Sequence, residues 1–294
     1  MSKQPANHPA DNIAELWSPG SVSAELRAPV SGHPLILEGM ATDSTTLVDS
    51  RPDAESQLDD LHETIADLHD RLLAAEAHSM LVVLQGLDGS GKSGTIKRLG
   101  RGLNPVGSSV ASFKEPDAKE VAEPFLARIR RELPEPGHIT CFDRSHYEDI
   151  IIPDALDDLS DKDITKRVKA INAFERELVE SGTVVLKCLL HISYDEQRKR
   201  FLQRLARPDE HWKFKESDLD TRAEWPRFQA AYGAAIGRTS TEVAPWFVVP
   251  ADHKWYRNWA VASLVCEHLA SLRSEYPALD GNADDFRARL AAPR

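Results

Sequence analysis

Short apolar runs alternate with stretches of helix-spaced apolar residues along most of this chain. Runs rich in Val, Leu, Ile and Phe are typical of buried strands, and they occupy residues 80–84, 110–113, 139–142, 183–192 and 246–249. Apolar residues at three- and four-residue spacing predict helices over residues 93–103, 118–133, 162–180, 193–205, 221–236 and 255–272. Strands that alternate with helices predict an α/β fold: a parallel sheet with helices on both faces and right-handed crossovers.

Two of the predicted helix starts carry the spacing of a capping box. Ser193 is followed three residues later by Glu196, and Thr221 by Glu224. In a capping box each of the two side chains bonds the backbone N–H of the other residue. We therefore expect helices to begin at both pairs.

Two regions lie outside the alternation. Residues 1–54 are rich in Pro, Ser, Ala and Asp without a sustained period, and we interpret them as a flexible arm or a strap over the domain surface. Residues 276–294 form a C-terminal tail, which leaves a single domain over 55–275. At its start, leucines and an isoleucine between positions 58 and 72 recur at helical spacing. This stripe predicts a helix that packs on the sheet. The alternative is a short coiled-coil seam, through which the chain could form a homo-oligomer.

Composition narrows the class of protein. The 294 residues are 41% hydrophobic, a share that is ordinary for a globular protein. The net charge of −11 is unfavourable for nucleic-acid binding. Cys141, Cys188 and Cys266 form no C-x-x-C pair, and the first two stand in apolar runs, which is typical of reduced core residues. No leader-like segment and no apolar run near the ~20 residues of a membrane span is visible. We expect a cytoplasmic protein with no membrane partner.

The first candidate site follows the first predicted strand. The run Leu84-Gln85-Gly86-Leu87-Asp88-Gly89-Ser90-Gly91-Lys92-Ser93 fits the phosphate-binding loop G-x-x-x-x-G-K-[ST] at every fixed position. In such a loop, backbone N–H groups wrap a phosphate and the next helix aims its positive dipole end at it. Lys92 supplies a mobile charge for terminal phosphates, and Ser93 a hydroxyl for Mg²⁺. The expected phosphate-binding residues here are Gly89, Ser90, Gly91, Lys92, Ser93 and Gly94. A chance glycine-rich turn is the weaker alternative, because strand and helix both flank the loop.

A second landmark ends the predicted strand at 139–142. An apolar strand that ends in Asp143 has the form of a Walker B element, whose carboxylate reaches the metal held by the loop. Carboxyl ends of neighbouring parallel strands lie at one edge of a sheet, so Asp143 and the loop are expected to meet. Arg144 could clamp a phosphate with two hydrogen bonds. An N-cap role is the alternative for Asp143. For His146 a structural role is favoured over a phosphohistidine, because P-loop enzymes usually transfer phosphate in line.

A third landmark is a basic segment between Lys187 and Lys215 in an otherwise acidic chain. A solvated helix face explains such a run equally well from charge alone. Its position after the strand at 183–192 favours a mobile lid over residues 194–222 that closes on phosphates and excludes water. The lid residues expected to bind phosphate are Arg200, Arg204, Arg207 and Lys213.

Several separate signatures resemble the polyphosphate kinase 2 family over residues 55 to 270. The loop, Ser112-Phe113-Lys114, Arg144-Ser-His-Tyr-Glu-Asp149, Phe174-Glu175-Arg176, Leu190-His191-Ile192-Ser193, Trp212-Lys213-Phe214 and Val249-Pro250-Ala251-Asp252-His-Lys254-Trp255-Tyr256-Arg257-Asn258 carry the likeness. The resemblance implies a P-loop kinase core with a helical lid. It implies in-line phosphoryl transfer between inorganic polyphosphate and a nucleoside mono- or diphosphate of AMP/ADP or GDP type, with Mg²⁺ or alternatively Mn²⁺. A nucleoside triphosphate would be product, or donor in the reverse direction.

The resemblance also implies roles for particular residues. Asp88, Lys92, Asp143 and Arg144 are the expected catalytic residues, and Lys114 joins the phosphate-binding set. The expected metal ligands are Asp88, Ser93 and Asp143, although most family sequences have Gly or Asp where Ser93 stands, so its role rests on general P-loop mechanics.

The chain departs from the family pattern at three places that bear on acceptor choice. His146-Tyr-Glu-Asp149 resembles the subgroup that phosphorylates AMP and ADP, yet that subgroup usually has Asn at the position of Asp143. A Trp common in the family is missing from Phe125-Leu126-Ala127-Arg128. After Ile151, where the subgroup usually has a basic residue, this chain reads Ile152-Pro153-Asp154.

Two other functions stay open. An ATP-dependent nucleoside monophosphate kinase similar to thymidylate kinase would share the loop and the Asp-Arg pair, but not the signature at 249–258. A non-catalytic nucleotide or polyphosphate sensor is disfavoured by the intact Lys92, Ser93 and Asp143.

Overall fold

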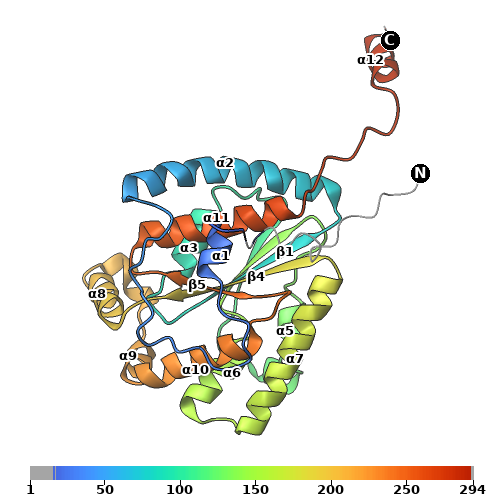
Figure 1. Cartoon of the computed structure of the whole chain (residues 1–294). Coiled ribbons are helices and arrows are strands. Elements are labelled where there is room, and N and C mark those ends of the chain that lie inside the picture. The colour runs from blue at the N-terminus through green and yellow to red at the C-terminus, as the bar shows by residue number, and fades with distance from the viewer. Residues whose placement is uncertain (1–15, 17, 293–294) are drawn as a thin grey trace.

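Five parallel strands form the central sheet of the computed structural model, which describes residue 16 and residues 18–292 (Figure 1). The strands are β1 (Ser79–Gln85), β2 (Ser108–Ser112), β3 (Ile139–Asp143), β4 (Thr183–His191) and β5 (Trp246–Pro250). Their spatial order is β2-β3-β1-β4-β5, so β1 lies at the centre between β3 and β4. The chain leaves β1 toward one side of the sheet and, after β3, crosses to the other. Ligands bind at the carboxyl ends of strands beside such a switch point.

Helices cover both faces of the sheet, as the alternation of elements predicts. Met80, Val82 and Leu84 of β1 belong to one hydrophobic core, and Leu81 and Val83 to the other. The first core is closed by α2 (Arg51–Ala75), α3 (Lys92–Leu99) and α11 (Lys254–Ser271). The second is closed by α6 (Glu148–Leu156), α7 (Asp161–Glu180) and α10 (Trp225–Thr239). The α/β fold expected from the sequence is confirmed.

The helix expected around residues 58 to 72 is α2, and its apolar stripe is part of the first core. Leu58, Ile65 and Leu72 are each at most 3% exposed. They pack with α11 and with apolar side chains of the sheet, and Figure 1 shows α2 lying along α11. The stripe is therefore used inside the molecule and does not leave a free coiled-coil seam.

Residues 18–50 run as a strap across the molecule from α11 to β5 and α10. They include the short helix α1 (Val22–Leu26), whose first backbone N–H groups donate to Glu267 of α11. Arg27 forms an antiparallel bridge with Phe247 of the edge strand β5. Further along, the N–H of Leu35 donates to the carbonyl of Gly233 at 2.8 Å. Residues 1–15 and 17, which the sequence places in the same arm, lie outside the described residues.

Two expected helices are wrong in extent. The helix expected over 118–133 is two short helices, α4 (Ala118–Ala122) and α5 (Ala127–Arg130), with Pro124 between them. Proline favours extended backbone in the residue before it, and Glu123 is extended. The helix expected over 221–236 is likewise divided, into α9 (Ser217–Ala223) and α10, which has Pro226 in its first turn.

The two expected capping boxes also differ from the structure. Thr221 lies inside α9, where its hydroxyl donates to the carbonyl of Ser217 and caps nothing. Ser193 does cap α8 (Tyr194–Leu205) by accepting from the N–H of Glu196. The N–H of Ser193, however, donates to Asp252 and not to Glu196. Only half of that box is formed.

The remaining described elements are the 3₁₀ helix η3 (Pro208–Lys213) and the terminal helix α12 (Ala283–Ala291), which Figure 1 shows away from the sheet. Within the described ranges, no helix combines the length and the apolar character needed to cross a bilayer. Cys141 and Cys188 are buried and free, and burial raises the pKa of the Cys141 thiol to about 12.

Candidate active site

The glycine-rich loop connects β1 to α3 with the backbone that a phosphate-binding loop needs. Gly86, Gly89 and Gly91 have φ values of 143°, 88° and 99°, a region that glycine enters without steric cost. A Cβ on Gly86 would stand 2.7 Å from the carbonyl oxygen of Leu190. The close contact with β4 therefore requires glycine. Helix α3 begins at Lys92, so its N-terminal N–H groups open toward the loop.

Ser93 and Asp143 meet across the switch point. The Oγ of Ser93 donates to Oδ2 of Asp143 at 2.5 Å, because β1 and β3 are paired with Leu84 opposite Asp143. The Nζ of Lys92 donates to the carbonyl of Gly86 at 2.6 Å and lies 4.0 Å from Asp88. The sequence prediction that the loop and the end of the 139–142 strand converge is confirmed.

Arg144 and Asp88 form the second contact between these segments. The Nη2 of Arg144 lies 2.6 Å from Oδ1 of Asp88, and its Nη1 lies 3.4 Å from Glu148. Burial would raise the pKa of Asp88, but the charges of Lys92 and Arg144 outweigh it and hold that pKa below its usual value. Arg144 has a φ of 65°, unusual for a residue other than glycine. A turn that strained is typical of functional sites.

Glu148 is a member of this site that the sequence reasoning missed. Burial raises the pKa of its carboxyl, against the lowering effect of Arg144 and Lys92. In the amide orientation that satisfies its neighbours, Gln85 donates to Glu148 at 2.9 Å and accepts from Ser145. Glu148 thus joins Gln85 at the end of β1 to Arg144 at the end of β3. Its place four residues after Arg144, at a helix start, is the signal that could have found it.

The basic residues expected in the lid occupy different kinds of position. Arg200 is buried, and its guanidinium donates to the carbonyls of Gly89, Ser90, Ala251 and Asp252. Arg200 therefore stabilises the conformation of the loop through hydrogen bonds to two loop carbonyls. Arg204 donates to the carbonyl of Lys213 and lies over the ring of Phe201. Arg207 is exposed and paired with Asp209 and Glu210.

Lys213 and Lys114 lie farther from the loop contacts. Lys213 is paired with Glu210 and lies over the ring of Trp212, which is 78% exposed. Lys114 is exposed just after β2, and its carbonyl accepts from Arg128. Gly94 is in the first turn of α3.

His146 and Lys187 are both fully buried, away from the solvent-accessible site. Lys187 donates to Glu175 at 2.6 Å, to the hydroxyl of Tyr147 and to the carbonyl of Thr239. The Nε2 of His146 is 3.4 Å from the same Glu175, and its side chain is 0% exposed. A phosphohistidine needs access to a phosphoryl donor, so this burial favours the structural role expected for His146. Lys187, the first residue of the basic segment described from the sequence, is buried and is the centre of an ionic cluster.

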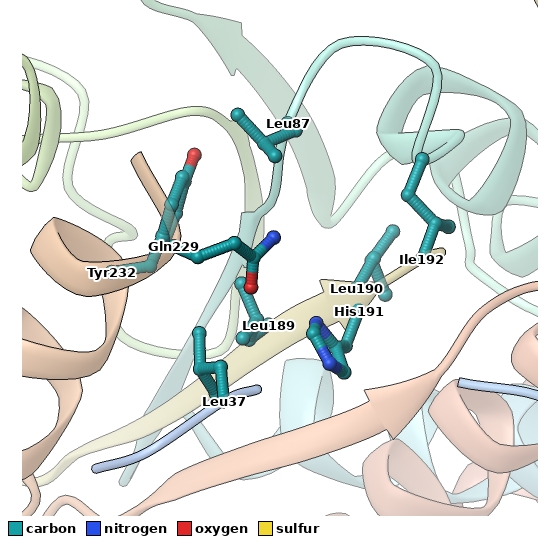
Figure 2. A pocket seen from close by; sticks show the side chains of 8 residues that line it. All are labelled: Leu37, Leu87, Leu189, Leu190, His191, Ile192, Gln229 and Tyr232. Carbon is teal, nitrogen blue, oxygen red and sulfur yellow. The ribbon is translucent and has the colours of Figure 1, made fainter. Parts of the chain in front are cut away.

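An apolar crevice lies beside the loop at the carboxyl end of β4. Figure 2 shows Gln229 and Tyr232 of α10 and Leu37 of the strap around the end of that strand. Its volume is about 10 Å³, room for about one water molecule. Burial and the nearby Glu148 raise the pKa of the Tyr232 hydroxyl well above its usual value. The crevice is too small for a nucleotide.

The oxygen atoms of this site suit a hard divalent cation. Mg²⁺-like ions are commonly held by one or two carboxylates together with substrate phosphates. The Ser93 hydroxyl and the Asp143 carboxylate lie side by side, with Asp88 on the neighbouring loop. Among residues 16 and 18–292, no three acidic, His or Cys side chains form a closed metal cluster. The arrangement fits a metal whose remaining ligands come from phosphate.

Comparisons with known proteins agree with this geometry. Residues 48–277 match the family model of polyphosphate kinase 2 (PPK2). The chain is 44% identical over 217 residues to the AMP/ADP-polyphosphate phosphotransferase of Meiothermus ruber, covering 74% of this chain and 81% of that protein. It is 38% identical over 227 residues to the ADP-polyphosphate phosphotransferase of Rhodopseudomonas palustris, covering 73% and 78% of the two chains.

A solved structure shows the same fold. The crystal structure of polyphosphate kinase 2 from Arthrobacter aurescens TC1 superposes with a TM-score of 0.88 at 35% sequence identity. The match covers 92% of this chain and 96% of the other. The family match over residues 48–277 includes all five strands, the phosphate loop and the basic segment at 194–222.

Proposed function

This chain belongs to the polyphosphate kinase 2 family, and on that premise we propose that it transfers phosphoryl groups between inorganic polyphosphate and a nucleoside mono- or diphosphate. The observation that carries the proposal is the contact of Ser93 with Asp143 beside Lys92. This contact joins the phosphate-binding loop after β1 to the carboxylate at the end of the adjacent strand β3. Relatives named as AMP/ADP- and ADP-polyphosphate phosphotransferases support the donor and the acceptor classes.

The reaction we propose is a direct in-line displacement. An oxygen of the nucleotide's terminal phosphate bonds to the terminal phosphorus of polyphosphate, and the bond from that phosphorus to the next bridging oxygen breaks. The bridging oxygen leaves with its electron pair on a chain one unit shorter, and no proton need be transferred. Catalysis of such a step is mostly positioning and charge stabilisation.

Each residue of the site has a role in that step. Lys92 leaves the carbonyl of Gly86 and binds an oxygen of the bound phosphate chain, while the N–H groups of residues 89–94 hold it. Arg144, kept in place by Asp88 and Glu148, contacts the transferring group. Ser93, Asp143 and Asp88 would hold Mg²⁺, or Mn²⁺ in its place, which offsets phosphate charge when bound.

The basic lid completes the site. Residues 194–222 include α8, η3 and all but the last residue of α9, and Arg204, Arg207 and Lys213 lie on this segment. We infer that closure of the lid brings these cations to the phosphates and excludes water. Lys114, which is exposed after β2, would contact the acceptor phosphate from the β2 edge of the sheet. Arg200 serves the same site by holding the loop.

The test is transfer between purified components. The full chain is incubated with Mg²⁺ and long-chain polyphosphate, and AMP, ADP, GMP or GDP is added separately before chromatography of the nucleotides. We expect ATP from ADP, and ADP from AMP, only when polyphosphate is present. Transfer from ATP to a monophosphate, with none from polyphosphate, would contradict the proposal and favour a nucleoside monophosphate kinase.

A further inference from the structure

Residues 33–42 of the strap contact the segments on both sides of the lid. The lid begins directly after Ser193, and α10 follows its end. Thr42 reaches the first of these segments through Asp252, and the strap backbone before Leu37 lies against the second. Between the two contacts, Leu37 is buried in the crevice at the end of β4 (Figure 2). One short segment of the strap therefore joins the two ends of the lid.

At the start of the lid, the Asp252 carboxylate holds the strap and the first lid helix together. Its Oδ2 accepts from the hydroxyl of Thr42 at 2.8 Å, and its Oδ1 accepts from the N–H of Ser193 at 2.8 Å. The backbone N–H of Asp252 donates in return to the carbonyl of Thr42 at 3.0 Å. Ser193 is the N-cap of α8. Because each carboxylate oxygen has one of these donors, Thr42 fixes the rotation of the group that receives the helix start.

Asp252 also connects this junction to the phosphate loop. Its carbonyl accepts from Nη2 of Arg200 at 2.9 Å. The same guanidinium donates through Nη1 to the carbonyls of Gly89 and Ser90. Because Arg200 lies on α8, a change in the direction of that helix would alter the contacts of the loop as well.

Beyond the end of the lid, the strap backbone packs directly on the backbone of α10. The N–H of Leu35 donates to the carbonyl of Gly233 at 2.8 Å. A Cβ on Gly233 would overlap with the carbonyl of Leu35, and a Cβ on Gly237 would overlap with the carbonyl of His33. Only glycine, which has no Cβ, allows the two backbones to approach this closely.

We propose that residues 33–42 fix both ends of the lid, and that Thr42 is a positioning residue for α8 that acts through Asp252. The inference rests on the proposed function, of which lid closure is a part. Arg222 of α9 donates to the carbonyl of Tyr194 at 2.7 Å, so the two ends of the lid also contact each other. With its base held in this way, the lid would close as a unit and bring its cations to the same phosphates each time.

Apolar burial contributes little to holding this part of the strap. Of residues 33–42, Leu37 alone is buried, and the side chain of Ile36 is 77% exposed. The remaining attachment consists of hydrogen bonds and of the close approach to α10. A segment with few buried apolar contacts opens locally at a low free-energy cost. Its hold on Asp252 should therefore depend measurably on the hydroxyl of Thr42.

The test removes the Thr42 hydroxyl and follows the first turn of α8. The variant is Thr42→Val, and Thr42→Ser is the conservative replacement that keeps the hydroxyl. The control is Thr46→Val, the same substitution at an exposed strap residue whose hydroxyl contacts Ser44. Hydrogen exchange of the amides at 193–197 is measured in the full chain without substrate. The value of kcat/KM for long-chain polyphosphate is measured with ADP as acceptor.

We expect Thr42→Val to speed exchange at 193–197 and to lower kcat/KM, each by on the order of tenfold, as for the loss of one hydrogen bond to a charged group. Exchange in the buried strands of the sheet should not change. Thr42→Ser and Thr46→Val should both resemble the wild type.

A second variant tests the other end of the lid. Gly237→Ala places a Cβ against the carbonyl of His33, although alanine in place of glycine ordinarily stabilises a helix. We expect faster exchange of the Leu35 N–H and, because the strap joins the two ends, faster exchange at 193–197 as well. Release of Leu35 with unchanged exchange at 193–197 would show that the two ends are not coupled and would overturn the inference.

The outcomes separate this inference from the proposed function. Unchanged exchange at 193–197 in Thr42→Val, or faster exchange throughout the chain, would overturn the inference while the function stands. Local release without a change in kcat/KM would show that the strap holds α8 without serving the reaction, and would also overturn it. If the wild-type protein transfers no phosphate from polyphosphate, the proposed function fails, and the exchange measurement alone decides whether Thr42 positions α8.

Discussion

Ser93 and Asp143 are fifty positions apart in the sequence and lie 2.5 Å apart between Oγ and Oδ2. The contact joins the first residues of α3 to the last residue of β3, two elements that meet only because β1 and β3 are adjacent in the sheet.

Asp143→Asn should lower kcat by on the order of 100-fold, because an amide is a weaker ligand for a hard cation than a carboxylate. Ser93→Ala should have a smaller effect, since the carboxylate remains. Turnover is measured as a function of Mg²⁺ concentration, with Asp163→Asn at the exposed start of α7 as the matched control. Wild-type kcat in Asp143→Asn would remove Asp143 from the metal site.

Arg144→Lys should lower kcat/KM by on the order of 100-fold, because lysine cannot contact Asp88, Glu148 and a phosphate in one fixed plane. The same change should move the pKa of Asp88 upward, since a charge that lowers it would be less well placed. Steady-state kinetics and carboxyl NMR titration measure the two effects. Arg130→Lys, in an exposed pair with Glu177, is the control. An unchanged Asp88 titration would show that Arg144 does not hold that carboxylate.

Lys187→Met should destabilise the fold by about 3–5 kcal/mol, because it leaves Glu175 buried without a counter-charge. Replacing both residues, with Glu175→Leu added, should recover much of that loss. Urea denaturation measures the free energy of unfolding of the two variants. If the double variant is as unstable as the single one, packing and not the charge of Glu175 is the cause.

The free energy of unfolding should decrease as the pH is lowered from 6.5 to about 4, because His268 is buried in its neutral form. Burial lowers the pKa of this histidine to about 4, although its hydrogen bond to the carbonyl of Leu264 opposes the shift. The unfolded chain takes up the proton below pH 6.5 and the folded chain does so only near pH 4, so the free energy of unfolding decreases by roughly 3 kcal/mol over this window.

The variant His268→Gln should reduce the slope of unfolding free energy against pH in this window. His69 and His191, whose pKa values burial also lowers, act in the same direction and leave a residual slope. Chemical denaturation at several pH values measures it. A slope equal to that of the wild type would show that His268 is not the group that titrates.

Local sequence patterns were sufficient to predict the strands, the loop and the meeting of Asp143 with Ser93. A strand, a glycine-rich turn and a helix start are determined by neighbours in the chain, and parallel pairing then brings the strand ends together. The breaks at Pro124 and Pro226 were also visible in principle, because proline interrupts backbone hydrogen bonding.

Contacts between distant segments could not be predicted in the same way. Lys187 stands inside an apolar strand, which could have indicated a buried lysine, but its partner Glu175 is on α7. Arg200 has the charge of a phosphate ligand, yet it donates to loop carbonyls that depend on how α8 packs. Charge is a property of the residue, whereas the partner of a charge is a property of the fold.

The strap described above also has a consequence for association between copies of the chain. Strand β5 is an edge of the sheet, and an exposed edge is a template on which another polypeptide can add a strand. Arg27 pairs with Phe247 and the N–H of Ala28 donates to the carbonyl of Trp246, so the strap occupies part of that template. The same segment that encloses the apolar crevice at Leu37 therefore also protects the protein from self-association through its edge strand.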